Sequence, residues 1–456
     1  MDELIRLDAL GAGGAYHSRS RLTITELTGT PVAELSLVPR LFVQRTMAAL
    51  REARTLPAHD RAAALARAGR LFATGVVDGI PAERYQHIVS RVSGMPITVV
   101  RSATEGIGRR AAEAYRTTRY ARPQGAVDDW RDPLTRNGHA VWTRRGDVFA
   151  VHAAGNHPGV HTLWLEALAL GYRVAVRPSR REPFTPHRLI TALRESGFGD
   201  DQVVLLPTDY AVADDVIRDA DLAMVYGGEE VVNKYGNDVR VLPQGPGRSK
   251  ILLTGRDWES HLGTIVESVS AFGGTACVNA TAVFVEGDPA PVAEAVAERL
   301  AAIPSLPPED DGAVLPVQPV ADAHAIEKYL LDHVNGATPV LGGDGVVDDL
   351  GDGSAALRPA VFRVNRPDAP QTGIELAFPC VWFAPWSRAD GVEPLRNTLV
   401  LTAITDDEGL VDRLVEDPSI RNVYLGDTPT YLMPPWVPHD GYLGEFLMRT
   451  KGVIRT

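Results

Sequence analysis

The alternation of hydrophobic and polar positions divides the chain into a helical part and a longer part of strands and helices. Between residues 38 and 123, apolar positions recur every three or four residues among good helix formers, which predicts several helices. Residues 138–155 alternate on both sides of an Arg-Gly-Asp sequence at 145–147, a pattern that predicts a β-hairpin. A helix is predicted directly after it, over residues 158–170.

From residue 171 onward, short apolar runs bounded by Gly and Pro alternate with amphipathic segments. Such runs predict buried strands, and strands that alternate with helices favour parallel sheets covered by helices. Two successive α/β units with a cleft between them are the simplest interpretation. The predicted strands are 171–179, 202–207, 221–228, 238–244, 250–255, 278–287, 399–405 and 420–426, and the clearest helices are 185–197 and 289–303.

The charge balance bears on the choice of partners. The 456 residues carry 46 Lys and Arg against 58 Asp and Glu, a formal net charge of -12. This balance gives no electrostatic reason to bind nucleic acid or an anionic membrane. No apolar run reaches the roughly 18 residues of a membrane span, and we expect no secretory signal. Two cysteines, Cys277 and Cys380, are too few for a disulfide framework or a Cys-based zinc site, which favours a reducing, cytoplasmic setting.

The first candidate for chemistry is Cys277, which follows a pair of glycines and precedes a strongly apolar strand. Glycines allow backbone and ligand to approach closely, which suits a reactive side chain. Free cysteines in proteins are more often inert buried thiols, so this residue alone does not decide between the two roles.

The second candidate is Asn156, at the junction between a predicted strand and a predicted helix. An asparagine there is ordinarily the helix N-cap, and the other role of its amide is donation to a developing oxyanion. His157 and His161 follow at helical spacing, but a proline lies between them and no third ligand is indicated, so we expect no metal site.

The third candidate is an arginine cluster at the C-terminal end of a predicted parallel strand, Arg177-Pro178-Ser179-Arg180-Arg181. Ligands of open α/β sheets bind at such strand ends, and arginine binds phosphate through paired hydrogen bonds. The cluster is therefore either a solvated loop or part of a phosphate site.

In their order and spacing, these signals resemble the aldehyde dehydrogenase superfamily, and the resemblance covers most of the chain. Several blocks carry it in register with the motifs of that family. They are Ser93-Gly94-Met95-Pro96, Gly155-Asn156-His157-Pro158, Arg177-Pro178-Ser179, Tyr226-Gly227-Gly228-Glu229-Glu230-Val231, Gly274-Thr275-Ala276-Cys277 and Glu375-Leu376-Ala377-Phe378-Pro379.

The resemblance implies an α/β fold with two doubly wound, Rossmann-like domains and a β oligomerisation flap. It assigns residues 1–124 and 148–250 to the cofactor-binding domain, 251–430 to the catalytic domain, and 125–147 with 431–456 to the flap. A homodimer or homotetramer is expected, because family members pair by adding flap strands to a neighbour's sheet.

The resemblance also implies roles for single residues. Cys277 would be the nucleophile, and the Asn156 amide and the main-chain N–H of Cys277 would stabilise the oxyanion. No metal is needed for this chemistry. The cofactor-binding residues would be Arg177, Ser179, Arg180, Gly227, Gly228, Glu375 and Phe378, with Arg177 and Glu375 on ribose hydroxyls.

The sequence departs from the family where hydrolytic members carry a glutamate that activates water. Gln244 stands at that position, and a neutral amide cannot act as a general base. The acylating branch of the family also lacks this glutamate and passes its acyl group to a thiol such as coenzyme A. The block beginning at Tyr226 is in addition similar to the fatty acyl-CoA reductase family of bioluminescence operons. The alternatives are a shifted register at Gln244, or a base supplied by Glu229 or Glu230.

A second departure concerns the cofactor. Arg180 stands where NAD-preferring members carry a glutamate that binds the adenosine ribose, and Arg181 follows it. Arginine attracts the 2′-phosphate of NADP, whereas a carboxylate repels it, so NADP is expected, with NAD as the other candidate. Val232 replaces the second glycine of the turn that starts at Gly227, which leaves the seating of the pyrophosphate open.

These features predict an NADP-dependent oxidoreductase that interconverts an acyl thioester and an aldehyde through a covalent Cys277 thioester. Coenzyme A or another thiol would be the co-substrate. One alternative is an ordinary aldehyde dehydrogenase that forms the free acid. Another is a non-catalytic relative that binds a partner enzyme, but the retention of Asn156, Cys277 and Glu375 argues against it.

Overall fold

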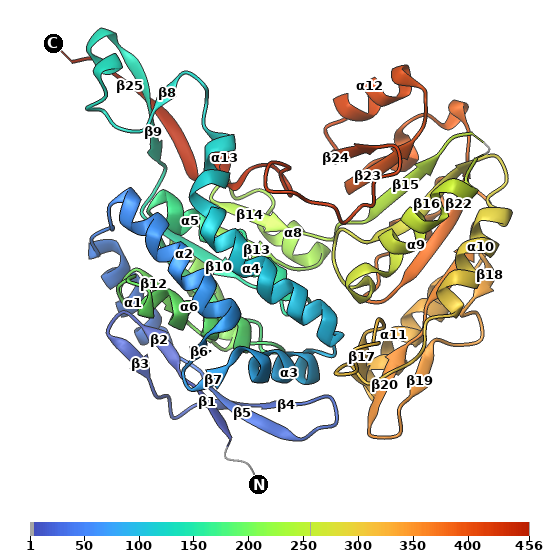
Figure 1. Ribbon diagram of the computed structural model, residues 1–456, viewed down its shortest axis with the longest axis horizontal. Coiled ribbons are helices and arrows are strands. Elements are labelled where there is room, and N and C mark those ends of the chain that lie inside the picture. Colours follow the sequence, from blue (N-terminus) through green and yellow to red (C-terminus); the bar gives the residue numbers. More distant parts are fainter. Residues whose placement is uncertain (1–3, 256, 456) are drawn as a thin grey trace.

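The computed structural model describes residues 4–255 and 257–455 and contains two seven-stranded sheets with helices on their faces (Figure 1). Helices occupy the region in which the periodicity predicts them, which confirms that prediction. None of the described helices is long and apolar enough to cross a membrane. The helices of this region are α1 (Arg40–Glu52), α2 (Ala58–Thr74), α3 (Ala82–Ser93) and α4 (Ile97–Thr117).

The first sheet is parallel over five strands and ends in two short antiparallel strands. Both of its faces are buried, because alternate residues of the central strand join two separate hydrophobic clusters, one under α2 and one under α1. Its strand order is β14 (Val241–Gln244), β13 (Leu222–Tyr226), β10 (Val148–His152), β11 (Arg173–Arg177), β12 (Val203–Leu205), β2 (Ala9–Gly11) and β3 (Gly14–Tyr16).

The second sheet is parallel except for one edge strand. Helices α9 (Leu262–Ser270) and α10 (Ala290–Ala301) cover one face, and α11 (Val320–His333) and α12 (Glu408–Glu416) contribute to the core on the other. Its order is β18 (Thr338–Leu341), β21 (Ala360–Arg363), β22 (Cys380–Trp386), β16 (Ala280–Glu286), β15 (Ser249–Leu253), β23 (Thr398–Ile404) and β24 (Ile420–Leu425).

The α/β pattern of the sequence is thus confirmed. Each apolar run predicted as a strand coincides with one strand of these sheets, and the two clearest predicted helices correspond to α6 (Phe184–Glu195) and α10. The short strands near the N-terminus were not predicted. They comprise β2 and β3, and a small separate sheet of β1 (Ile5–Leu7), β5 (Pro31–Ser36) and β4 (Arg21–Thr25).

The predicted hairpin over 138–155 is wrong. Strand β9 (His139–Arg144) pairs with β25 (Met448–Val453) and β8 (Ala126–Val127), whereas β10 lies in the first sheet. The turn between them is held by other elements, because an Asp221 carboxylate oxygen accepts from the main-chain nitrogens of Asp147 and Val148 at 2.8 and 2.9 Å. The strand that leaves the turn therefore joins β13 and not β9.

The prediction of one continuous helix over 158–170 is also wrong. A 3₁₀ turn, η3 (Pro158–His161), is followed by a separate short helix, α5 (Leu165–Leu170). The turn is tightened by the bond from the main-chain nitrogen of Thr162 to the oxygen of Gly159 at 3.0 Å, three residues earlier. The region therefore consists of two short elements joined by residues 162–164.

The chain returns to the first unit after the last strand of the second sheet. Residues 426–442 cross from β24 to α13 (Leu443–Leu447), which packs beside α5, and β25 then extends the three-stranded β8–β9–β25 sheet (Figure 1). The assignment of this small sheet as an oligomerisation flap, and the limits of the two domains, stay predictions.

Candidate active site

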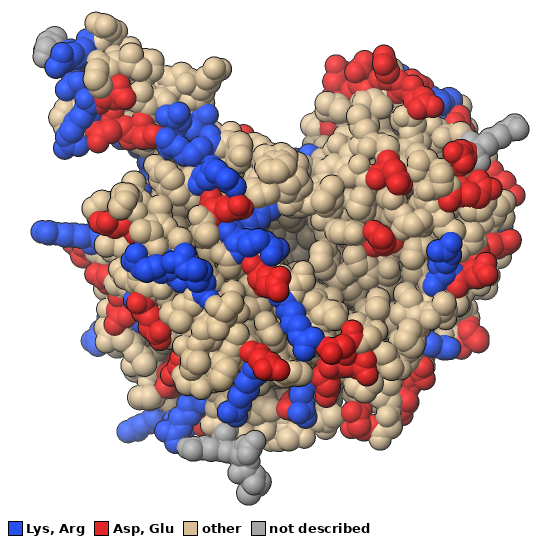
Figure 2. All heavy atoms as spheres, viewed as in Figure 1, with Lys and Arg blue, Asp and Glu red and all other residues tan. Residues whose placement is uncertain are grey.

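A cavity of about 1130 Å³ lies between the two seven-stranded units. The face shown in Figure 2 is hollowed between the two halves of the molecule. Among the described residues, no group of three or more His, Cys, Asp or Glu is arranged to hold a metal ion. The cavity is lined by residues of α4 and by parts of segments 154–166, 226–229, 244–248, 272–278, 373–375 and 431–443.

The loop before Cys277 has an unusual backbone. Phe272, Gly273 and Gly274 have φ values of 55°, 70° and 66°, three consecutive residues in the left-handed region. At Gly274 a Cβ atom would lie 2.4 Å from the main-chain nitrogen of Pro379, so a side chain has no room there. The glycine pair therefore allows a sharp, tightly packed turn that brings Cys277 to the cavity.

The same loop is braced by Asn279, a buried residue. Its Oδ1 accepts from the main-chain nitrogen of Ala276 at 2.9 Å. Its Nδ2 donates to the main-chain oxygens of Ser268 and Ala271 at 3.1 and 2.8 Å. The sequence analysis did not single out Asn279 for this role.

The Cys277 thiol is neutral in this environment. Burial raises its pKa to about 12, and the nearby Glu375 carboxylate acts in the same direction. The main-chain N–H groups of Cys277 and Val278 favour the thiolate and partly oppose this rise. Since the thiolate is the nucleophilic form, the site needs a proton acceptor when the sulfur attacks a carbonyl.

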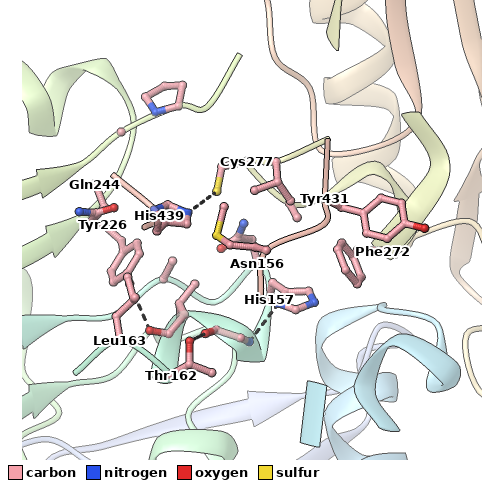
Figure 3. A pocket seen from close by; sticks show the side chains of 18 of the residues that line it. Asn156, His157, Thr162, Leu163, Tyr226, Gln244, Phe272, Cys277, Tyr431 and His439 are labelled. Atoms are coloured by element: carbon pink, nitrogen blue, oxygen red, sulfur yellow. Dashed lines mark hydrogen bonds between the residues drawn. The ribbon is translucent and has the colours of Figure 1, made fainter. Parts of the chain in front are cut away.

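Asn156 is directed at the cysteine loop. Its Nδ2 donates to the main-chain oxygen of Thr275 at 3.1 Å, and it lies beside Cys277 in the cavity (Figure 3). The N-cap of the following 3₁₀ turn is His157, whose Nδ1 accepts from the main-chain nitrogen of Gly159 at 2.9 Å. The cap role considered for Asn156 is therefore wrong, and the second N–H of its amide is free to point at a ligand.

Gln244 lies at the end of β14, buried, with its side chain at the cavity wall near Tyr226 (Figure 3). Its main-chain oxygen accepts from the nitrogen of Gly227 at 3.1 Å, which joins the two strand ends. Of the two glutamates considered as replacement bases, Glu229 lines the cavity and forms an ion pair with Arg248 that lowers the pKa of its carboxyl group.

Glu375 belongs to the same wall. The main-chain nitrogen of Arg248 donates to its Oε2 at 2.6 Å, and Arg248 has a φ of 47°, a left-handed conformation that this contact stabilises. Burial raises the pKa of the Glu375 carboxyl group. Gly227 and Gly228 also line the cavity, at the end of β13.

The remaining cofactor candidates lie elsewhere. Arg177 Nε donates to Thr208 Oγ1 at 2.9 Å, and Arg180 Nη2 lies 2.8 Å from Asp209 Oδ1. Both guanidinium groups face the ring of Tyr210, which is 76% exposed. The three residues Arg177, Ser179 and Arg180 thus gather at the end of β11 and do not line the cavity itself.

Two further sequence candidates are buried against protein and not against the cavity. Phe378 is 1% exposed and lies in the core of the second unit beside Gly274. Arg181 donates to the main-chain oxygen of Ser93 and to Gln318 Oε1 at 2.7 and 2.8 Å, so it is committed to structural bonds.

Sequence analysis missed His439. Its Nε2 lies 3.4 Å from Cys277 Sγ, and the imidazole comes from the segment that crosses between the two units (Figure 3). Nothing near His439 in the sequence points to Cys277, because 162 residues separate the two and only the return of the chain brings them together.

Comparisons with known proteins bear on the family and the fold of this chain. The model of the aldehyde dehydrogenase family matches residues 23–392. A search of curated protein sequences finds no significant match. Among solved structures, an NAD-dependent aldehyde dehydrogenase from Sinorhizobium meliloti is 18% identical, with a TM-score of 0.83 over 99% of this chain and 95% of that one.

Two other similar structures are an NADP dependent enzyme of E. coli and an indole-3-acetaldehyde dehydrogenase complexed with NAD+. The first has a TM-score of 0.82 at 16% identity and covers 98% of each chain. The second has a TM-score of 0.83 at 16% identity, over 100% of this chain and 98% of that one. The fold is therefore that of aldehyde dehydrogenases, and, with a family model matching most of its length, this chain belongs to the aldehyde dehydrogenase family of NAD(P)-dependent oxidoreductases.

Proposed function

We propose that this protein interconverts an aldehyde and an acyl thioester with NADP(H), through a covalent thioester on Cys277. The observation that carries the proposal is Gln244, a buried amide at the cavity wall where hydrolytic members of the family carry the glutamate that activates water. An amide neither accepts nor delivers a proton near pH 7, so Gln244 leaves water without its usual base.

The residues around Cys277 suit the covalent steps. In the oxidative direction the sulfur adds to the aldehyde carbonyl, and the Asn156 amide and main-chain N–H groups stabilise the oxyanion. A bound nicotinamide cofactor supplies the hydride acceptor or donor. The acyl group stays on the sulfur until a second nucleophile releases it, which divides one difficult reaction into two easier ones.

The choice between thiol and water depends on the strength of the available bases. The ion pair with Arg248 lowers the pKa of Glu229, and burial lowers the pKa of the His439 imidazole, so both are weak bases for water. A thiol is far more acidic than water, so a weak base still serves to deprotonate it. A thiol needs little help, because a few per cent is already ionised near pH 7 and thiolates are intrinsically nucleophilic. Release to coenzyme A or another thiol is therefore favoured over release to water.

The cofactor preference rests on the end of β11. The Nε of Arg180 is buried and lacks a hydrogen-bond partner among the described residues, and the exposed ring of Tyr210 lies beside it. The Nη2 of this guanidinium donates to the main-chain oxygen of Thr208 at 3.3 Å and pairs with Asp209, an exposed carboxylate whose ion pair contributes little stability. A 2′-phosphate would replace that carboxylate, so the residues present fit NADP.

One observation favours a second function, the oxidation of an aldehyde to the free acid. The His439 imidazole is close enough to the sulfur to accept a proton from water in the acyl-enzyme. This function requires the imidazole to act on water despite its lowered basicity.

A steady-state assay of acyl-CoA substrates with NADPH tests the proposal. We expect aldehyde formation and NADPH consumption in a one-to-one ratio. The variant Gln244→Glu should gain acid formation from aldehyde in the absence of thiol, and the exposed control Gln124→Glu should not. Absence of turnover across acyl-CoAs of short, medium and long chain, together with thiol-independent acid formation by the wild type, would support the second function instead.

We also propose that the protein is a homodimer or homotetramer that pairs through the β8–β9–β25 sheet. Its edge strand β25 is largely exposed and, among the described strands, pairs with β9 on one side only. Light scattering coupled to size exclusion tests this directly, and a monomer at micromolar concentration would contradict it.

A further inference from the structure

Two contacts anchor the segment that carries His439, one to the main chain of His439 and one to the side chain of Asp440. The side-chain amide of Asn422, on β24, donates to the main-chain oxygens of Leu399 and His439 at 3.0 and 2.7 Å. Next to His439, the Asp440 carboxylate pairs with Arg421 at 3.1 Å. The position of the imidazole therefore does not depend on bonds made by the imidazole itself.

Among the described residues, the imidazole has one polar contact, and that contact is with the reacting sulfur. Nε2 lies 3.4 Å from Cys277 Sγ, within the range of a hydrogen bond that involves sulfur. Nδ1 is buried and has no hydrogen-bond partner in the described part of the chain. Burial lowers the pKa of His439 and raises that of Cys277, so the resting pair is a neutral thiol beside a neutral imidazole. In the tautomer that carries the ring proton on Nδ1, Nε2 accepts a hydrogen bond from the thiol.

Other charged groups surround the pair. Glu375 faces the sulfur from the second unit, and the phenol of Tyr226, on β13, is close enough to Cys277 for the two groups to influence each other's ionisation. Asp440 lies beside the imidazole, with its charge shared by Arg421, and Arg248 lies beside Glu375. The nearby carboxylates disfavour a thiolate on Cys277, whereas Asp440 favours an imidazolium at His439.

We propose that His439 is a catalytic residue of this enzyme, the base that takes the proton of the Cys277 thiol as the sulfur attacks and returns it when the sulfur leaves. This inference rests on the covalent Cys277 chemistry of the proposed function. It does not depend on whether a thiol or water finally accepts the acyl group.

The proton can be followed through each step. The Sγ–H bond breaks as the sulfur–carbon bond forms, and the proton moves to His439 Nε2 while negative charge appears on the carbonyl oxygen. With a nicotinamide cofactor bound as hydride acceptor, the aldehyde carbon would reach the acyl level on Cys277, and the imidazolium releases its proton to solvent. In the second half, Nε2 accepts the proton of the incoming thiol, and Cys277 recovers a proton from Nε2 as it leaves. The sum is aldehyde, NADP+ and thiol giving acyl thioester, NADPH and one proton.

The buried surroundings of Cys277 and His439 require the proton to move while the sulfur attacks the carbonyl. An imidazolium and a thiolate present before substrate binds would place two charges in a buried site, and the unpartnered Nδ1 would give the imidazolium no support. When the oxyanion forms near Asn156, the positive imidazolium gains a negative neighbour. The proton therefore moves as the bond forms.

Alkylation of Cys277 by iodoacetamide, followed by peptide mass spectrometry, tests this role without any acyl chemistry. At pH 7 we expect His439→Gln to slow alkylation of Cys277 by about 10² or more. The buried Cys380 is the internal reference. The matched control is His261→Gln, whose histidine contacts Asp427 at the start of the same segment and does not touch the sulfur.

The pH profile separates a base from a structural residue. The wild-type rate should be level between pH 7 and 9, because neutral imidazole is present throughout. The rate of His439→Gln should rise about tenfold per pH unit as hydroxide ionises the thiol. Added imidazole should restore the rate of His439→Ala at pH 7, a rescue that a merely structural role does not give.

The proposal would be overturned if both His439 variants were alkylated as fast as the wild type, with a rate that does not change between pH 7 and 9. It would also be overturned if added imidazole did not change the alkylation rate of His439→Ala. A failure of the proposed function would give a different result. In that case alkylation still depends on His439, but acyl-CoA and NADPH are not consumed.

Discussion

The side-chain amide of Asn156 donates to the main-chain oxygen of Thr275 at 3.1 Å, and so joins the end of a strand in the first unit to the loop that presents Cys277 in the second. One N–H of the amide is used in this bond, and the other is left for a ligand. The contact holds the proposed oxyanion donor against the loop of the nucleophile, although the two residues belong to different units.

Removal of this donor should slow catalysis without loss of the fold. Asn156→Ala is expected to lower kcat by roughly 10²–10³, the usual loss for one donor of an oxyanion hole. The exposed Asn237→Ala is the control, and its kcat should equal that of the wild type. A kcat of Asn156→Ala within about twofold of the wild type would assign Asn156 a structural role only.

The two cysteines should behave differently. Cys277→Ala should abolish turnover and leave the cofactor dissociation constant unchanged, because the sulfur is the nucleophile. Cys380 is buried in the core of the second sheet, so Cys380→Ala should keep its activity and lower the melting temperature. Measurable turnover in Cys277→Ala would exclude the covalent mechanism.

Arg180 should decide the cofactor preference. The wild type is expected to have a higher kcat/KM with NADPH than with NADH, and Arg180→Glu should reduce that ratio by at least about tenfold, since one charge-assisted bond to phosphate is lost and a repulsion is gained. The exposed Arg45→Glu on α1 is the control. Equal kcat/KM values of the wild type for both cofactors would contradict the assignment of Arg180.

A carboxyl group in the cavity should make stability depend on pH. Burial raises the pKa of Glu166 from 4.5 to about 7, and Arg110 opposes this rise. The folded protein therefore holds a proton that the unfolded chain has released, so stability falls as the pH rises from about 4.5 to about 7 and stays lower above it.

Replacement of this carboxyl group should remove the effect. Glu166→Gln should melt at a higher temperature than the wild type at pH 8, and the difference should shrink near pH 4.5. Calorimetry at both pH values measures it, with the exposed Glu83→Gln as the control. The same difference at both pH values would show that burial does not shift the Glu166 titration.

The parallel strands were predictable because both faces of each sheet are covered, which gives continuous apolar runs. The pairing of residues 138–155 was not predictable. Their alternation correctly indicates two strands, but Asp221, which is distant in sequence, binds the turn and β10 joins another sheet. Short edge strands such as β2 and β3 carry three residues each, too few for a periodic signal.

Local motifs located part of the site and missed the part that depends on the return of the chain. The glycine pair and Asn156 stand in blocks that can be read from the sequence. His439 lies in a segment rich in proline and without regular structure, and its approach to Cys277 depends on the anchor that Asn422 provides from β24. No spacing in the sequence encodes such a contact.

The central claim is that the acyl group leaves Cys277 for a thiol. Stopped-flow measurement of NADPH formation from aldehyde and NADP tests it most directly. In the absence of thiol we expect a burst of about one NADPH per active site followed by a slow phase, because Gln244 cannot act as a base for water, and coenzyme A should accelerate only the slow phase. Fast, sustained NADPH formation with stoichiometric free acid and no response to coenzyme A would contradict the account.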